Sequence, residues 1–215
     1  GFSAEGAPWP VFSPSRGQSA TMALMTDDLV PLLRSCLLML VVMSRSVAAG
    51  PHEQVNPDTG LSSWKAGDQE FSLELVQVVP DYVRAVYASR GLPQIIIDRV
   101  SSYCVFGTIL KNNSGATLSY DVTEWRYVTT DGKAHTARPK TEWVKEWQDM
   151  GVAFRWSLLP EKQTYAPGDW GQGFTTIELP PGTVLDLHYS WEQDGVTHSG
   201  TIREVRCAPA DIESQ

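Results

Sequence analysis

The sequence predicts a mainly β protein, an antiparallel, immunoglobulin-like β-sandwich of about seven strands with short helical insertions. Three observations predict this class. Short segments in which apolar and polar residues alternate recur through the second half of the chain. Turns containing Gly or Pro separate these segments, and Asp131-Gly132 and Asp194-Gly195 are typical of β-hairpin turns. The helical segments are too few to form the βαβ units of a parallel sheet.

One strand and two helices are expected first. Residues 71–79 alternate as a strand with one apolar face. Asp81 then caps a helix that ends at Gly91, where a left-handed backbone is easily adopted. Pro93 begins a second helix, because the apolar residues after it recur at helical spacing although three isoleucines in a row would suit a strand. These residues are Ile96, Val100 and Tyr103.

The sheet pattern begins at residue 104. Residues 104–110 form a strand, and the next strand begins at Leu118 with a bulge near Glu124, where the alternation slips by one residue. A short helix is expected over 141–150, followed by a half-buried strand over 152–158. The last strands are expected over 174–179, 184–191 and 196–207.

The N-terminal part resembles an export signal. A run of apolar residues over 36–43 is followed by small residues up to Ala49, which is the pattern that a signal peptidase reads. Asp27 and Asp28 lie where positive charge is usual, so an amphipathic helix that stays with the protein is the alternative. We expect a disordered leader or upstream translation over 1–21, a signal peptide over 22–49, a flexible linker over 50–69 and the β-sandwich domain over 70–215.

Export has consequences for the cysteines and for location. Cys36 is removed with the signal, so Cys104 and Cys207 remain in a compartment where thiols oxidise, and we expect one disulfide between them. Two buried, unpaired cysteines are the alternative. The apolar run is shorter than the roughly 20 residues that span a bilayer, so no integral membrane segment is expected after cleavage. The expected location is periplasmic or secreted.

The charge and motifs exclude several function classes. A formal net charge of -8 has the wrong sign for contacts with nucleic-acid phosphates. No Gly-x-Ser-x-Gly motif is present, no histidines have the spacing of a metal site, and no cofactor is expected. We therefore expect a protein that is not an enzyme. The alternative is a metal-handling or hydrolytic periplasmic protein that uses His135, His188 or His198, two of which lie on adjacent expected strands.

A family pattern occurs in the first hairpin region. The residues that carry it are 105–109, Asn112, Ser114-Gly115, Leu118, Val122 and Asp131-Gly132. With these residues, about thirty in span, the chain resembles the FxLYD and LEA-type β-sandwich domains of exported proteins. The resemblance implies a non-catalytic extracytoplasmic module and transfers no site residues.

Tryptophan is abundant, with eight residues in the chain. Trp156 and Trp191 fit inward positions on expected strands. Trp143, Trp147 and Trp170 lie on a short helix and a turn, where exposed indoles would stack on a sugar ring or on a partner. The alternative is that these three seal one end of the sandwich, since Trp is usually buried. The sequence thus favours an accessory or binding module whose partner is a protein or polysaccharide.

Overall fold

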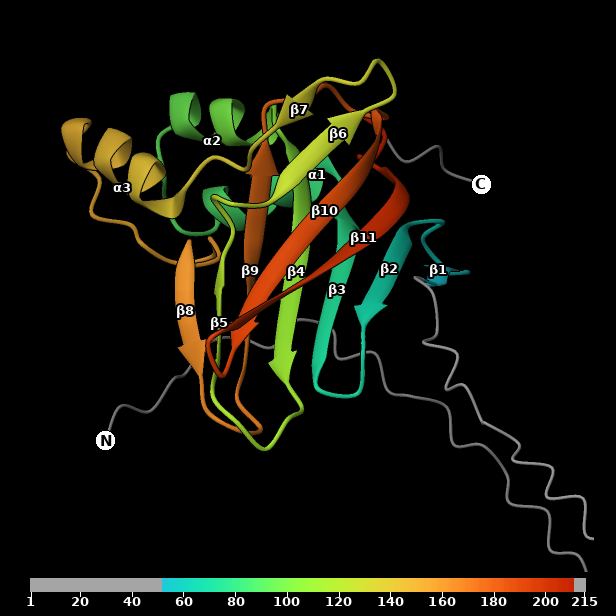
Figure 1. Cartoon of the computed structure of the whole chain (residues 1–215). Helices are drawn as coiled ribbons and strands as arrows, with labels where there is room; N and C mark the ends of the chain where they lie inside the picture. The colour runs from blue at the N-terminus through green and yellow to red at the C-terminus, as the bar shows by residue number, and fades with distance from the viewer. Residues whose placement is uncertain (1–51, 211–215) are drawn as a thin grey trace, which may run out of the picture. The chain divides into compact units, whose positions relative to one another are not determined.

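The computed structural model describes residues 52–210, which form two antiparallel sheets and three helices. The expected leader and signal peptide lie outside the described residues. Sheet A has the order β1 (His52–Val55), β2 (Ser62–Gly67), β3 (Phe71–Val78), β4 (Cys104–Asn112), β9 (Trp170–Ile177). Sheet B has the order β7 (Ala134–His135), β6 (Arg126–Thr129), β10 (Val184–Gln193), β5 (Leu118–Asp121), β8 (Lys162–Tyr165), and β11 (Val196–Arg206) pairs with β10. The predicted antiparallel β-sandwich is confirmed (Figure 1).

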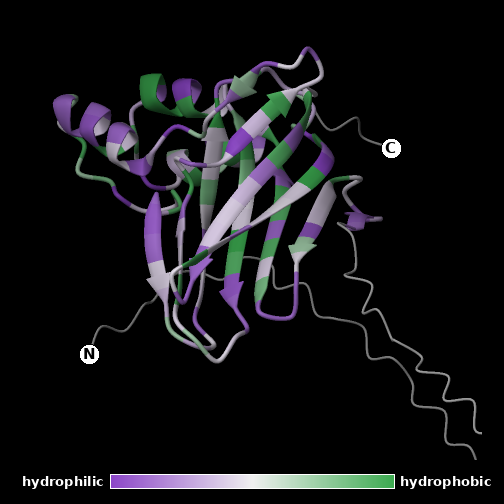
Figure 2. Cartoon of the chain, in the orientation of Figure 1, coloured by the Kyte–Doolittle hydropathy of each residue, from purple (hydrophilic) through white to green (hydrophobic). Residues whose placement is uncertain are grey.

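The main core lies between the two sheets. Alternate residues of the long strands point inward, and Figure 2 shows the resulting alternation of hydrophobic and hydrophilic residues along them. The ring of Phe71 on β3 stacks on the indole of Trp191 on β10, with centroids 4.4 Å apart. This contact joins sheet A to sheet B, and buried residues of both sheets form one continuous cluster around it.

A disulfide joins the two sheets, as predicted. Cys104 begins β4 in sheet A, and Cys207 directly follows β11 in sheet B. Their Cα atoms are 5.3 Å apart, and the two residues are separated by 103 positions in the sequence. Both side chains are buried in the main core. The bridge therefore joins the start of β4 in sheet A to the end of β11 in sheet B across the sandwich.

The helices cover part of the outer face of sheet A. They are α1 (Pro80–Ala88), α2 (Gln94–Ser101) and α3 (Lys140–Asp149), and they gather near one end of the strands (Figure 1). Their buried residues pack with Val78, Val105 and Phe174, which point outward from sheet A, to form a second core cluster. The two predicted helices before residue 104 are thus confirmed, although Val79 rather than Asp81 is the N-cap of α1.

Both predicted hairpin turns are present. Asp194 and Gly195 join β10 to β11 with φ values of 51° and 73°. Two successive residues with positive φ are what a tight type I′ hairpin turn requires. Gly132, with φ of 81°, lies in the turn between β6 and β7.

Three sequence predictions need correction. Residues 50–69 are not a linker where the structure describes them, because they carry β1 and β2, and Trp64 on β2 is only 3% exposed. Residues 152–158 do not form the predicted half-buried strand; only Leu158 makes a single bridge, to Phe174. The described residues form eleven strands rather than about seven: β1, β2, β7 and β8 were not expected, and the bulged strand expected from Leu118 is two strands, β5 and β6.

Candidate functional site

Two of the three tryptophans expected to bind a ligand are core residues. The side chains of Trp143 and Trp147 are fully buried between α3 and sheet A. The indole N–H of Trp143 donates to the hydroxyl of Thr176 at 2.8 Å, and the guanidinium of Arg138 lies 3.9 Å from the ring centroid. These two residues therefore cannot stack on a ligand, and the expectation of a three-residue site is wrong. They attach a helix to the sheet instead.

Trp170 is the member of the expected site that is exposed. It begins β9, and 59% of its surface is accessible. Its cross-strand partner is Lys111 on β4, so the two side chains lie on the outer face of sheet A. The inward neighbour of Trp170, Gly171, packs so closely that a Cβ there would meet the hydroxyl of Tyr165. Trp170 is thus held on a tightly packed strand with its ring in solvent.

A second exposed indole, Trp156, belongs to the segment beside β9. The sequence pattern predicts a core position for it, but it is 78% exposed. The next residue, Ser157, has a φ of 71°, which breaks the extended chain that the alternation suggested. The carbonyl of Ser157 accepts a 2.6 Å hydrogen bond from the backbone N–H of Phe174 on β9. Both exposed indoles are therefore attached to the same edge strand.

The outer face of sheet A is open where the helices do not cover it. Register places its side chains in two rows across β9, β4 and β3, and we call these six residues the open face. Adjacent strands lie about 4.8 Å apart, so the rows extend about 10 Å across the three strands. They are Trp170, Lys111 and Ser72 in one row and Gln172, Ile109 and Glu74 in the next.

Two of the four polar side chains of the open face are unused by the fold. The side chains of Lys111 and Gln172 have no hydrogen-bond or ion-pair partner among residues 52–210. Glu74 pairs with Lys65 of β2, with Nζ and Oε2 3.5 Å apart. Ser72 accepts a 3.3 Å hydrogen bond from the side chain of Asn113. The face thus combines one large aromatic ring with an ammonium and an amide that are ready to hydrogen-bond.

Sheet B carries a different feature, a groove of about 360 Å³. It forms where β5 and β6 leave β10. Ser119 of β5 pairs with Glu192, and Arg126 of β6 pairs with His188. Between these two pairs, residues 120–125 lie opposite the shorter segment 189–191. The extra residues turn away from β10, at the place where the sequence predicted a bulge. The indole N–H of Trp125 donates to the carbonyl of Ser190 at 3.0 Å. This hydrogen bond replaces one of the backbone hydrogen bonds that β10 would otherwise receive from its neighbouring strand.

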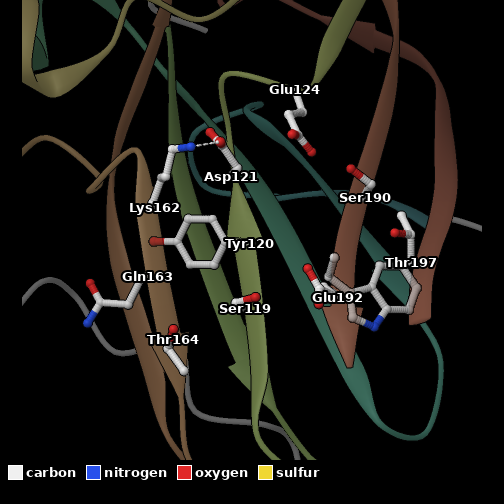
Figure 3. Close-up of a pocket in the computed structure, with 11 residues that line it drawn as sticks. Ser119, Tyr120, Asp121, Glu124, Lys162, Gln163, Thr164, Ser190, Glu192 and Thr197 are labelled. Carbon is white, nitrogen blue, oxygen red and sulfur yellow. Dashed lines mark ion pairs between the residues drawn. The ribbon is translucent and has the colours of Figure 1, made fainter. Parts of the chain in front are cut away.

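Most of the residues that line this sheet-B groove are polar (Figure 3). Two aromatic residues, Tyr120 and Trp191, also line it, and both are nearly buried. The hydroxyl of Tyr120 donates to the carbonyl of Pro160 at 3.3 Å. The other residues that line the groove are Ser119, Asp121, Glu124, Lys162, Gln163, Thr164, Ser190, Glu192 and Thr197.

One ion pair crosses the groove wall. Lys162 and Asp121 are cross-strand partners of β8 and β5, with Nζ and Oδ2 2.6 Å apart. Burial raises the pKa of Asp121, but hydrogen bonds from Lys162 and Thr123 outweigh burial and hold this pKa below its usual value. The same hydrogen bond raises the pKa of Lys162. Both groups are therefore charged at neutral pH.

The histidines named for the alternative function lie apart. His188 points outward from β10 and contacts the hydroxyl of Thr201 at 2.9 Å. His198 stacks on Trp191, with ring centroids 5.3 Å apart, so it lies on the inner side of the sheet. His135 is on β7, which pairs with β6 rather than with β10. Within residues 52–210 no three His, Cys, Asp or Glu side chains converge in the manner of a metal site.

Comparison of the chain with protein-family models and with curated proteins gave no match. The FxLYD and LEA-type resemblance therefore stays a prediction. Among solved structures, the chain is similar to a candidate lipoprotein, YcdA, from Bacillus subtilis, with a TM-score of 0.38 and 9% sequence identity. The alignment covers 65% of this chain and 38% of that protein, and at this TM-score it carries no argument about function. In the described part of the chain no helix is long and apolar enough to span a membrane.

Proposed function

We propose that this protein is an extracytoplasmic, non-catalytic binding module that holds a saccharide chain on the open face. The observation that carries the proposal is the exposed indole of Trp170, which lies on a rigid strand among polar side chains. A Trp that is 59% exposed is unusual, because burying its large apolar surface is favourable. The indole face fits the apolar face of a sugar ring, and the neighbouring ammonium and amide suit sugar hydroxyls.

Trp156 supports the same ligand class. It is the other exposed indole attached to β9, and its neighbour Ser157 bonds to Phe174, four residues or about 13 Å along the strand from Trp170. A chain of several sugar units is needed to reach both rings. A flat sheet surface with polar residues around an aromatic ring also suits an extended, hydroxyl-rich polymer better than it suits a compact apolar ligand, which needs a deep pocket.

The charges of the open face support binding rather than hydrolysis. Hydrolysis of a glycosidic bond commonly needs two carboxyl groups, one on each side of the scissile bond. The open face has a single carboxylate, Glu74, and Lys65 pairs with it. The disulfide supports an oxidising, extracytoplasmic location, because such bonds are rare in proteins of the cytosol.

Affinity electrophoresis tests the proposal. The protein is run through gels that contain soluble polysaccharides, including a neutral β-glucan, an α-glucan and a solubilised cell-wall glycan. We expect retardation on at least one gel. Trp170→Ala should abolish most of it, since removal of a central Trp commonly costs 2 kcal/mol or more, about 30-fold in affinity. Trp170→Tyr should restore part of it.

Ile95→Ala is the matched control, because Ile95 is an exposed apolar residue of similar accessibility, 67%, on α2. This variant should migrate like the wild type. Retardation that survives both Trp170→Ala and Trp156→Ala would contradict the proposed surface, and no retardation on any of the glycans would contradict the ligand class.

A further inference from the structure

We propose that the sheet-B groove is a second binding site, separate from the open face, and that it takes an organic cation. The ligand carries an ammonium or guanidinium group, as a lysine or arginine side chain or a polyamine does. The groove lies on the opposite sheet from Trp170, so this inference does not depend on the proposed saccharide surface.

The charge of the groove selects the ligand. Three carboxylates and one ammonium line it. The ammonium, from Lys162, is bound to Asp121 at 2.6 Å. Glu124 and Glu192 form no ion pair with any described residue, and both point to the groove in Figure 3. The groove therefore has two more negative than positive charges, which attract a cation and repel an anion.

One buried donor beside the groove suits the same ligand. The Trp191 indole is 6% exposed and lines the groove. Its ring stacks on Phe71 and on His198 in the core, so the ring face is not offered to the ligand. The indole Nε1 of Trp191 is also buried and has no hydrogen-bond acceptor among residues 52–210. An unpaired buried donor is unfavourable, so a ligand that brings an acceptor next to its cation, as a peptide carbonyl does, gains from meeting it.

The size of the groove agrees with a small ligand or a single side chain. Its volume, about 360 Å³, is at the lower end of the range for small-molecule sites. It lies where β5 and β6 separate from β10 and is open to solvent, so a side chain of an extended peptide can enter it.

Calorimetric titration of the full-length protein tests the site. The probes are Nα-acetyl-lysine methylamide, Nα-acetyl-arginine methylamide and spermidine, and Nα-acetyl-norleucine methylamide is the uncharged control. We expect weak binding of at least one cationic probe, none of the norleucine probe, and weakening as salt is added. Binding of the amino-acid probes alone assigns a peptide side chain, and binding of spermidine alone assigns a free amine. Equal binding of the norleucine probe, or no binding of any cation, would overturn the proposal.

Variants that remove a carboxylate and a variant that removes the ammonium should change the affinity for the cationic probe in opposite directions. Glu192→Gln and Glu124→Gln should each weaken binding about tenfold, because each removes one charged acceptor. Glu178→Gln removes the same charge after the end of β9, outside the groove, and should change nothing. Lys162→Gln should tighten binding several-fold, because it frees Asp121. Weaker binding in Lys162→Gln would show that Lys162 itself contacts the ligand, and this would contradict a cationic ligand.

A spectroscopic signal separates groove binding from general charge effects. The indole N–H resonance of Trp191 should shift as the cationic probe is added. The indole N–H of Trp147 is the matched control, since it is also buried without an acceptor among the described residues but lies in the helical cluster. A shift of Trp147 and not of Trp191 would overturn the placement of the site.

Discussion

Removal of the disulfide should cost this protein a large share of its folding stability. The variant is Cys104→Ala/Cys207→Ala, and the bridge that it removes closes a loop with a sequence separation of 103. In the chain-entropy model a loop of this length stabilises the folded state by about 4 to 5 kcal/mol, because it restricts the unfolded chain. Single domains are stable by only roughly 5 to 15 kcal/mol in total. The double variant should therefore lose about a quarter or more of its stability.

Urea unfolding followed by circular dichroism measures this loss. The oxidised protein, the reduced protein and the double variant should separate into two groups, with the last two about 4 to 5 kcal/mol less stable. The melting temperature should fall by about 8 to 20 °C. As a control, reductant should not change the double variant further.

Two outcomes would contradict this expectation. A difference below about 1 kcal/mol would show that the bridge does not restrict the unfolded chain as the model assumes. Thiol titration gives an independent check, because Cys36 is expected to leave with the signal and the denatured, unreduced mature protein should then show no free thiol. Two free thiols would contradict the pairing.

The remaining predictions concern packing and charge. Trp147→Ala should destabilise the fold by about 3 to 5 kcal/mol in urea unfolding, whereas Trp156→Ala should stay within about 0.5 kcal/mol, because the first ring is buried and the second is 78% exposed. Gly173→Ala should unfold at lower urea than Gly107→Ala, since a Cβ at Gly173 would lie 2.4 Å from a backbone nitrogen but at Gly107 no closer than 3.8 Å to any atom; equal midpoints would contradict this. Asp121→Asn should be less stable than the wild type at pH 7, and the difference should vanish as the pH falls through the lowered pKa of Asp121, because a depressed carboxyl pKa stabilises the fold only above that pKa. A difference that persists at a pH well below that pKa would show a packing effect instead.

The sheet and its hairpins could be predicted because their signals are local. Asp194-Gly195 required only two adjacent residues that accept positive φ. The helix after Pro93 could be recognised because Ile96 and Val100 recur at helical spacing, although the three isoleucines favoured a strand. The disulfide followed from the number of cysteines that remain after the expected signal cleavage.

The unpredicted strands lack such a local signal. β2 has a single buried residue, Trp64, and β1 has none, so neither shows the alternation that identifies a strand. Their pairing along one edge of sheet A orders them instead. The prediction of a core position for Trp156 was wrong for the opposite reason. Its segment alternates well, but the positive φ of Ser157 breaks the extended chain and leaves the indole in solvent.

The candidate sites could be predicted only in part from the sequence. Trp170 was named correctly as an exposed aromatic residue, but burial of Trp143 depends on how α3 packs on sheet A, and the sequence does not give that packing. The sheet-B groove arises between strands that are far apart in the chain. Its one sequence signal was the slip of alternation near Glu124, which marked where the strand leaves its neighbour.

Backbone NMR during a saccharide titration would show whether the open face binds a glycan. The glycan that retards the protein in affinity electrophoresis, shortened to a soluble oligosaccharide, is added to the ¹⁵N-labelled protein, and the shifted amide and indole signals are mapped onto the structure. The proposed function predicts the largest shifts at the indole of Trp170 and at the amides of Lys111 and Gln172, with the sheet-B groove and the buried indole of Trp143 unchanged. Shifts confined to the groove or to the helices, with Trp170 unmoved, would contradict it.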